Sequence, residues 1–221
     1  WAQNIPIPGP EGRGASIPIE VGLGGDGGPP NAGNPGVNGG DSTFGAAPNS
    51  YYFIAKGGGH GACDTSTSGA DGGSGGGTHY GPPDPGVEGT GIQPQQNPGK
   101  PWVTNSQYGN PGSRGAASPN WQSGAGGGAG GAAANGDQSN RGEAGESVNL
   151  QGVWNVPYYM PGPDPYRPGI NPKPQHHYGG GGGAGDYNPY ISQRFPSGAG
   201  YGGGGIGGPS GGSGNGSNAV D

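Results

Sequence analysis

Large apolar side chains are sparse along this chain and gather in a few short stretches separated by glycine. Residues 19–23, IEVGL, alternate apolar side chains with Glu20 and Gly22, and this period of two predicts a half-buried β-strand. Residues 51–56, YYFIAK, combine the aromatic and β-branched side chains that are typical of strands. No stretch has the spacing of an amphipathic helix, so we expect a few short β-strands and essentially no α-helix.

The barest stretch is Gly124–Ala134, GAGGGAGGAAA, where no side chain is larger than a methyl group. By composition such a run is a flexible linker, and it becomes ordered only if backbone packs directly on backbone. Polyproline-II geometry suits this packing because it has three residues per turn and no internal hydrogen bonds, so that every N–H and C=O points to a neighbour. We therefore expect a mostly irregular or extended chain that forms a bundle of polyglycine-II strands, with Gly124–Ala134 at its centre. The scaffold glycines of that central strand are Gly124, Gly126, Gly127, Gly128, Gly130 and Gly131.

A period of three is visible earlier in the chain. Counted in threes from Gly24, glycine recurs up to Gly45, with Pro30 and Ser42 as the exceptions. Such a strand has one bare face, which we expect to point inward while the other two face out. Collagen requires glycine at every third position without interruption, and this chain does not meet that requirement.

Composition supports one extended domain over residues 1–221. The chain has 61 Gly and 26 Pro, and only 26% of its residues are hydrophobic, so side-chain burial cannot offset the conformational entropy lost on ordering and dense hydrogen bonding between strands must do so. Within this domain, residues 62–100 are rich in turn signals and are expected to form loops. Its parts are a Pro/Ile-rich lead-in strand (1–23), Gly-rich strands and loops (24–145), an aromatic and Pro-rich segment (146–178) and C-terminal Gly-rich strands (179–221).

Charge and cysteine content exclude several classes of partner and framework. The net charge is −6 with eight Lys and Arg, which argues against nucleic acid and against an anionic membrane. No apolar run reaches the length of a membrane span, so we expect no membrane insertion. Cys63 is the only cysteine and excludes an intrachain disulfide. The chain opens on Trp1 rather than Met, as expected of a processed protein or of a fragment.

Three motifs occur in an order that resembles a known family. They are VGLGGDGG at Val21–Gly28, NGGDSTFG at Asn38–Gly45 and FIAKGGGHG at Phe53–Gly61. This order is similar to the glycine-rich domain of bacteriophage tail and tail-fibre proteins. The resemblance implies a polyglycine-II bundle like that of phage tail-tip adhesins, which present loops to a receptor on the bacterial surface, and it implies no catalytic residues.

Catalytic and metal-binding patterns are weak. No Lys of a phosphate-binding loop is present, because neither Lys56 nor Lys100 is followed by Ser or Thr. His176 and His177 are adjacent, and an extended chain points neighbouring side chains apart. His60, Cys63 and Asp64 form a looser cluster. We expect no metal and no cofactor at these residues.

Paired carboxylates offer no better catalytic site. Glu143 and Glu146 lie in a Gly-rich loop without an apolar pocket to shift a pKa, and Asp26 and Asp41 are interpreted as turn residues. The sequence therefore predicts that the protein is not an enzyme.

Aromatic side chains are the candidate contact residues, because Tyr and Trp dominate recognition surfaces and also cap a bundle that lacks another core. Asn215 begins a lone glycosylation sequon, in keeping with an extracellular protein. The residues predicted to contact a receptor or another subunit are Trp154, Tyr158, Tyr159, Tyr187, Tyr190 and Phe195.

Two functions follow as hypotheses. The first is a non-enzymatic structural or adhesive virion protein, a phage tail-fibre or tip component that contacts a bacterial receptor or neighbouring virion subunits. The second is a secreted structural subunit that polymerises into an extracellular fibril. Both predict an oligomer located in a virion or outside the cell. Ice binding is a third alternative, which no regular Thr or Ala array supports.

Overall fold

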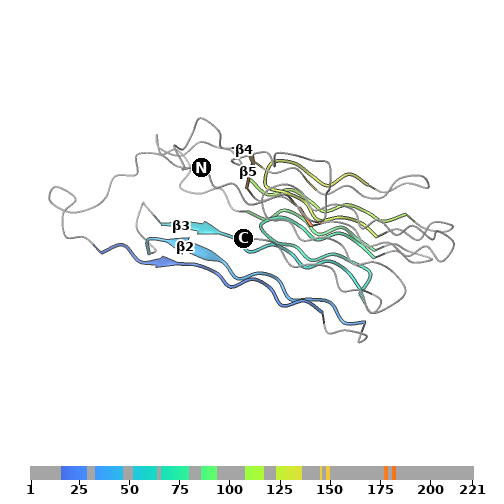
Figure 1. The fold of residues 1–221 in the computed structure, drawn as a ribbon, viewed down its shortest axis with the longest axis horizontal. Helices are drawn as coiled ribbons and strands as arrows, with labels where there is room; N and C mark the ends of the chain where they lie inside the picture. The colour runs from blue at the N-terminus through green and yellow to red at the C-terminus, as the bar shows by residue number, and fades with distance from the viewer. Residues whose placement is uncertain are drawn as a thin grey trace, which may run out of the picture.

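The computed structural model describes residues 16–28, 33–46, 52–63, 66–79, 86–93, 108–116, 123–135, 145, 148–149, 177–178 and 181–182. Within these residues the chain contains short β-strands, long extended segments and no helix (Figure 1). The expectation of a mostly non-helical chain is confirmed for this part. The strands are β1 (Ile19–Glu20), β2 (Ser42–Phe44), β3 (Phe53–Ala55), β4 (Val148–Asn149) and β5 (His177–Tyr178).

An open antiparallel sheet is formed by β1, β2 and β3 in that order. Its register places Phe44 opposite Phe53, and their ring centroids are 6.2 Å apart with the planes tilted by 55°. This cross-strand aromatic pair stabilises the short ladder. The strand predicted over 51–56 is confirmed, because β3 lies inside that range. A separate pair, β4 and β5, is also antiparallel.

The predicted half-burial of residues 19–23 is wrong. Ile19, Val21 and Leu23 are 67%, 79% and 85% exposed, and only the first of them lies in a strand, β1. The physical reason is that β1 is the edge of a single-layered sheet, and no described segment packs over these side chains. The alternation of apolar and polar residues was consistent with the extended geometry of β1. The half-burial that it also predicted requires a second layer, and no described segment provides one.

Beyond the strands, extended segments run lengthwise beside one another (Figure 1). The blue segment 16–28 lies at the lower margin, teal segments follow, and the yellow-green segments lie toward the upper side. Their backbones are joined by hydrogen bonds over long sequence separations, such as Gly40 N–H to the Leu23 carbonyl at 2.8 Å and Gly39 N–H to the Gly58 carbonyl at 3.0 Å. The described part is therefore an array of backbones rather than a sheet with a side-chain core.

Segment 69–78 is bonded to neighbours on several sides. Its backbone is hydrogen-bonded to segments 57–62, 87–92, 110–113 and 124–127. The bonds include Gly73 N–H to Gly57 O (2.7 Å), Gly72 N–H to Thr90 O (3.2 Å), Gly75 N–H to Asn110 O (3.0 Å) and Gly127 N–H to Gly75 O (2.9 Å). A strand in a flat sheet bonds at most two neighbours, so this segment uses more directions than a sheet provides.

Segment 69–78 is also largely buried. Gly72, Gly73 and residues 75–78 are buried, although residues 62–100 were expected to be loops. Turn residues predict loops only when their backbone groups face water, and here neighbouring backbones satisfy those groups.

Gly124–Ala134 is divided by a bend. Ala125, Gly127 and Gly128 are buried, whereas residues 129–131 bend and the Gly128 N–H donates to the Gly131 carbonyl at 3.0 Å. Of the expected scaffold glycines, the last two therefore lie in the bend, and the first four belong to the extended part. The stretch is one of several inner segments, and it continues as a straight strand only as far as Gly128.

Candidate functional site

The aromatic residues predicted to make contacts lie outside the described residues. They are Trp154, Tyr158, Tyr159, Tyr187, Tyr190 and Phe195. The same holds for Asp64, Glu143, Glu146, His176 and Asn215. A candidate site within the described part is therefore sought among the glycines. They differ in whether the surrounding space could accept a side chain.

Gly75, Gly76 and Gly77 each face a different neighbour. A Cβ atom built on them would come within 3.0 Å of a carbonyl oxygen, that of Gly89, His60 and Gly124 respectively. Real Cβ atoms essentially never come so close, so any side chain at these positions would push the segments apart. Three consecutive residues thus point in three directions, each filled by another backbone.

The outer segment 22–28 has one closed face and one open face. Gly22, Gly25 and Gly28 would each bring a Cβ within 3.0 Å of a carbonyl oxygen in residues 34–40. Gly24 and Gly27 would meet nothing within 4 Å. A glycine at every third position was predicted to form the inward face, counted from Gly24. The spacing of three holds, but in this segment the inward face contains Gly22, Gly25 and Gly28, because the neighbouring segment 34–40 lies on that side.

Segment 57–61 also has both closed and open glycine positions. Gly57 faces the Gly39 carbonyl and Gly59 faces the Ala70 carbonyl, while Gly58 and Gly61 would meet nothing within 4 Å. Glycine therefore has two roles in this array. At closed positions it is required for contact between backbones, and at open positions it leaves a bare surface.

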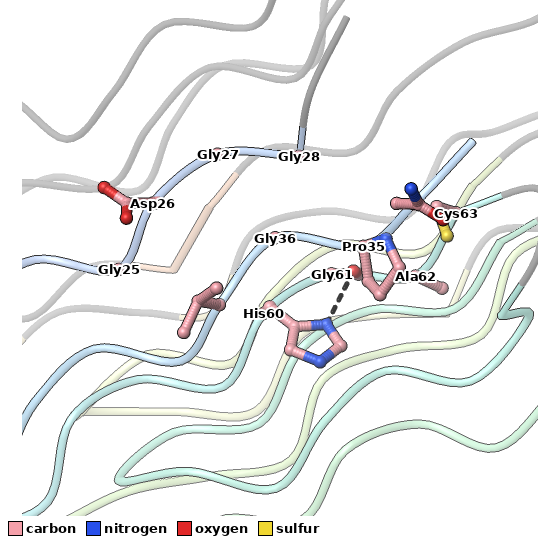
Figure 2. A pocket seen from close by; sticks show the side chains of 12 residues that line it. Gly25, Asp26, Gly27, Gly28, Pro35, Gly36, His60, Gly61, Ala62 and Cys63 are labelled. Carbon is pink, nitrogen blue, oxygen red and sulfur yellow. Dashed lines mark hydrogen bonds between the residues drawn. The ribbon is translucent and has the colours of Figure 1, made fainter. Parts of the chain in front are cut away.

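One such bare surface is a groove of about 390 Å³ (Figure 2). Three extended segments line it with four residues each, 25–28, 34–37 and 60–63. Hydrogen bonds place the second segment between the other two, since Val37 N–H donates to Asp26 O at 2.9 Å and His60 N–H donates to Asn38 Oδ1 at 2.8 Å. The groove is therefore walled mainly by backbone.

Ionisable side chains at the groove do not converge on a point. The His60 ring is turned back to its own chain, with Nδ1 3.0 Å from the Gly61 carbonyl oxygen (Figure 2). The Asp26 carboxylate projects away from it on the other wall. His60 and Cys63 share the lining, yet within the described residues no group of three His, Cys, Asp or Glu side chains is placed to hold a metal ion.

Asp41 is more than the turn residue it was interpreted to be. Its Oδ2 lies 2.7 Å from Lys56 Nζ, and its Oδ1 accepts a hydrogen bond from the Gly57 N–H at 3.0 Å. The Lys56 hydrogen bond, followed by that of Gly57, holds the pKa of the Asp41 carboxyl below its usual value. In β2 and β3, Ser42 lies opposite Ala55. Asp41 and Lys56 are the next residues beyond this pair, so the antiparallel pairing of these strands could have indicated the ion pair.

A second ion pair joins distant segments. Arg114 Nε lies 2.5 Å from Glu88 Oε2, and this hydrogen bond lowers the pKa of the Glu88 carboxyl. Both side chains are partly exposed to solvent, where an ion pair contributes little to stability. The pair joins segments 86–93 and 108–116 at the surface.

The buried side chains of the described residues are few and small. Ala116 and Ala125 are the buried hydrophobic residues, and Thr78 and Ser113 are the buried polar ones. Within the described residues there is also no helix with the length and apolar character needed to cross a membrane. These residues therefore provide a scaffold of packed backbones with a shallow groove.

Comparison with known proteins identifies one family. The family model described as a glycine-rich domain matches residues 9–220, and the chain belongs to this glycine-rich domain family. Among curated proteins and solved structures, the comparisons find no match.

Proposed function

We propose that the protein is a non-enzymatic structural subunit whose glycine segments pack as polyglycine II. The observation that carries this proposal is the arrangement of Gly75, Gly76 and Gly77, whose three directions are filled by three different backbones. A β-strand alternates between two faces, whereas a polyproline-II helix has three residues per turn and therefore three faces. The spacing of the closed glycines Gly22, Gly25 and Gly28 supports the same geometry.

Such packing makes a rigid body from described segments that bury almost no apolar side chain. The buried side chains Thr78 and Ser113 use their hydroxyls to bond backbone, so they join segments rather than forming a cavity. Segments joined in this way suit a structural role. A test of the packing is hydrogen exchange, in which the amides of Gly73, Gly75 and Gly127 are expected to exchange slowly while that of Gly61 exchanges fast; equal exchange at all four would refute it.

The specific role we favour is a phage tail-fibre or tip component, located in the virion, whose aromatic residues contact a bacterial surface receptor or an adjoining subunit. The three motifs that resemble tail-fibre glycine-rich domains motivate this role. Replacing Tyr187, Tyr190 and Phe195 by alanine is expected to abolish host adsorption with the thermal midpoint unchanged. Normal adsorption by that variant would remove the receptor role of these residues.

An extracellular fibril subunit is the second candidate. The open glycine positions and the exposed side chains of Ile19, Val21 and Leu23 at the margin of the array favour it, because further chains can pack there. Electron microscopy of the assembled particle separates the two candidates. A helical array of identical chains supports the fibril, and a unique tip on a larger assembly supports the tail protein.

A further inference from the structure

The groove lined by residues 25–28, 34–37 and 60–63 is an open surface groove between three segments of the array. Its floor, segment 34–37, lies between two walls that are hydrogen-bonded to residues 34–40 on either side. Each wall presents four residues, which correspond to about 12 Å at the rise of a polyproline-II strand. One more extended strand of about four residues matches the length of this groove.

Three backbone N–H groups of the lining residues are candidate donors to such a strand. Among the described residues, no hydrogen bond uses the N–H of Gly27, Gly36 or Gly61. A Cβ at Gly27 or Gly61 would meet nothing within 4 Å, so both walls allow another backbone to approach. A proline-rich strand lacks a backbone donor at each proline but keeps every carbonyl free, and its carbonyls match these donors.

Charge favours a basic strand. The lining contains the Asp26 carboxylate and no Lys or Arg, and the whole chain carries a net charge of −6. Pro35 and Val37 add apolar surface against which proline rings can pack. The expected ligand is therefore a short peptide rich in proline, with cationic side chains and no acidic ones.

One segment of this chain has that composition. Residues 166–175, YRPGINPKPQ, contain three prolines, Arg167 and Lys173 and no acidic residue. They belong to the stretch 150–176, whose two flanking strands, β4 and β5, are paired with each other. A chain of this length reaches on the order of 40 Å from its base when extended.

We propose that the groove binds segment 166–175 of a second copy of this chain. The groove segments lie toward the lower margin of Figure 1 and the β4–β5 pair lies at the upper side, and this placement favours a neighbouring copy over the same chain. The contact is heterologous, because one surface binds a different one, and repetition yields an open row or a closed ring. The inference rests on the proposed polyglycine-II packing and specifies how subunits associate.

The test titrates a fluorescein-labelled peptide, YRPGINPKPQ, onto the full chain and measures fluorescence anisotropy. Saturable binding is expected, and a double variant Gly27→Leu/Gly61→Leu that narrows the groove should weaken it by about tenfold or more. The matched control is Gly24→Leu/Gly58→Leu, which adds the same side chains at equally open positions of the same segments outside the groove. A peptide with Glu in place of both cations should not bind.

The same measurement on the full chain carrying Arg167→Glu/Lys173→Glu covers the case in which the groove is already filled. Binding that appears only in this variant supports the proposal. Absence of binding to both chains overturns it, and so does equal binding by the groove variant and its control.

Sedimentation velocity then identifies the occupant. Oligomers of the wild-type chain that dissociate in the groove variant support a second copy, and a wild-type chain that stays monomeric at every concentration overturns that part. Circular dichroism of the same samples tests separately whether the chain is still folded. A groove variant that keeps the wild-type spectrum but no longer binds the peptide has lost the binding site and not the packing of the segments.

Discussion

The carbonyl oxygen of His60 occupies the place where residue 76 would carry its Cβ atom. Gly76 is buried, and its N–H donates to the Ala70 carbonyl at 3.0 Å. The absence of a side chain at this residue is therefore a packing requirement, since two backbones meet where a methyl group would stand. Gly58, only two residues before His60 on the neighbouring segment, is in open space by the same measure.

Replacing Gly76 by Ala is expected to destabilise the protein by about 3 kcal/mol, because the added methyl group overlaps a backbone atom that cannot rotate away. Gly58→Ala is the matched control. It adds the same atom without a clash and restricts the unfolded chain, so its effect should lie between zero and a gain of about 1 kcal/mol. Urea unfolding of both variants gives the comparison. Equal losses would contradict the assignment of closed and open glycines.

The Asp41–Lys56 pair predicts a loss of stability in acid. The pKa of Asp41 is lowered in the folded chain, so its stabilising contribution is fully present above the unfolded value of about 4 and is lost as the pH falls through the folded-state pKa. Asp41→Asn should flatten the dependence of the urea midpoint on pH in that acidic window. A variant with the full wild-type pH dependence would show that the pair does not contribute.

Glu88→Gln serves as the comparison for that experiment. The pKa of Glu88 is lowered as well, so its contribution is lost in the same direction on acidification. Its partner Arg114 is 51% exposed, compared with 34% for Lys56, and salt screens exposed pairs more strongly. We expect the Glu88 effect to be smaller and to disappear first when salt is added.

The sequence predicted the kind of structure better than its arrangement. The aromatic and β-branched run at 51–56 predicted β3, and the scarcity of apolar residues predicted that backbone must pack on backbone. Which residues of the glycine runs are buried was not predicted, because runs such as 72–77 and 124–131 differ little in composition. Neighbours are chosen by backbone hydrogen bonds, which leave no distinct residue pattern.

The candidate groove was also beyond the sequence. Gly24 and Gly27 occur in the same period as other glycines, and only the position of segment 34–40 makes them open while Gly25 and Gly28 are closed. The Asp41–Lys56 pair was within reach, since both residues flank the antiparallel pair β2–β3 at matching positions. It was missed because an Asp after two glycines was interpreted as a turn residue.

Gln93 extends the edge of β3 with its side chain. Its Oε1 accepts from the Lys56 N–H at 2.8 Å, and its Nε2 donates to the Ile54 carbonyl at 2.7 Å. The amide thus takes the place of a peptide group in a neighbouring strand. Gln93→Met, which keeps the length and removes both bonds, should cost about 1–2 kcal/mol, and Gln93→Glu should cost at least as much at neutral pH because it sets a carboxylate oxygen against the Ile54 carbonyl.

Hydrogen exchange of the Lys56 amide checks the role of Gln93 directly. We expect faster exchange in Gln93→Met than in the wild-type chain. Gln93→Glu should retain part of the protection, since its carboxylate still accepts from that N–H. Unchanged exchange in the Met variant would mean that the side-chain amide is not the partner that protects Lys56.

Thr78 provides a test of the polar interior. Its side chain is 1% exposed, and its Oγ1 accepts a hydrogen bond from the Gly115 N–H at 2.9 Å. Thr78→Val keeps the volume but leaves this buried N–H without a partner, a loss that costs about 1–3 kcal/mol.

Thr90→Val is the control, because Thr90 is exposed and no hydrogen bond of its hydroxyl ties two segments among the described residues. Thermal unfolding should show a clear decrease in the midpoint for Thr78→Val and almost none for Thr90→Val. A Thr78→Val variant as stable as the wild-type chain would show that the Thr78 hydroxyl does not contribute to stability through the Gly115 N–H.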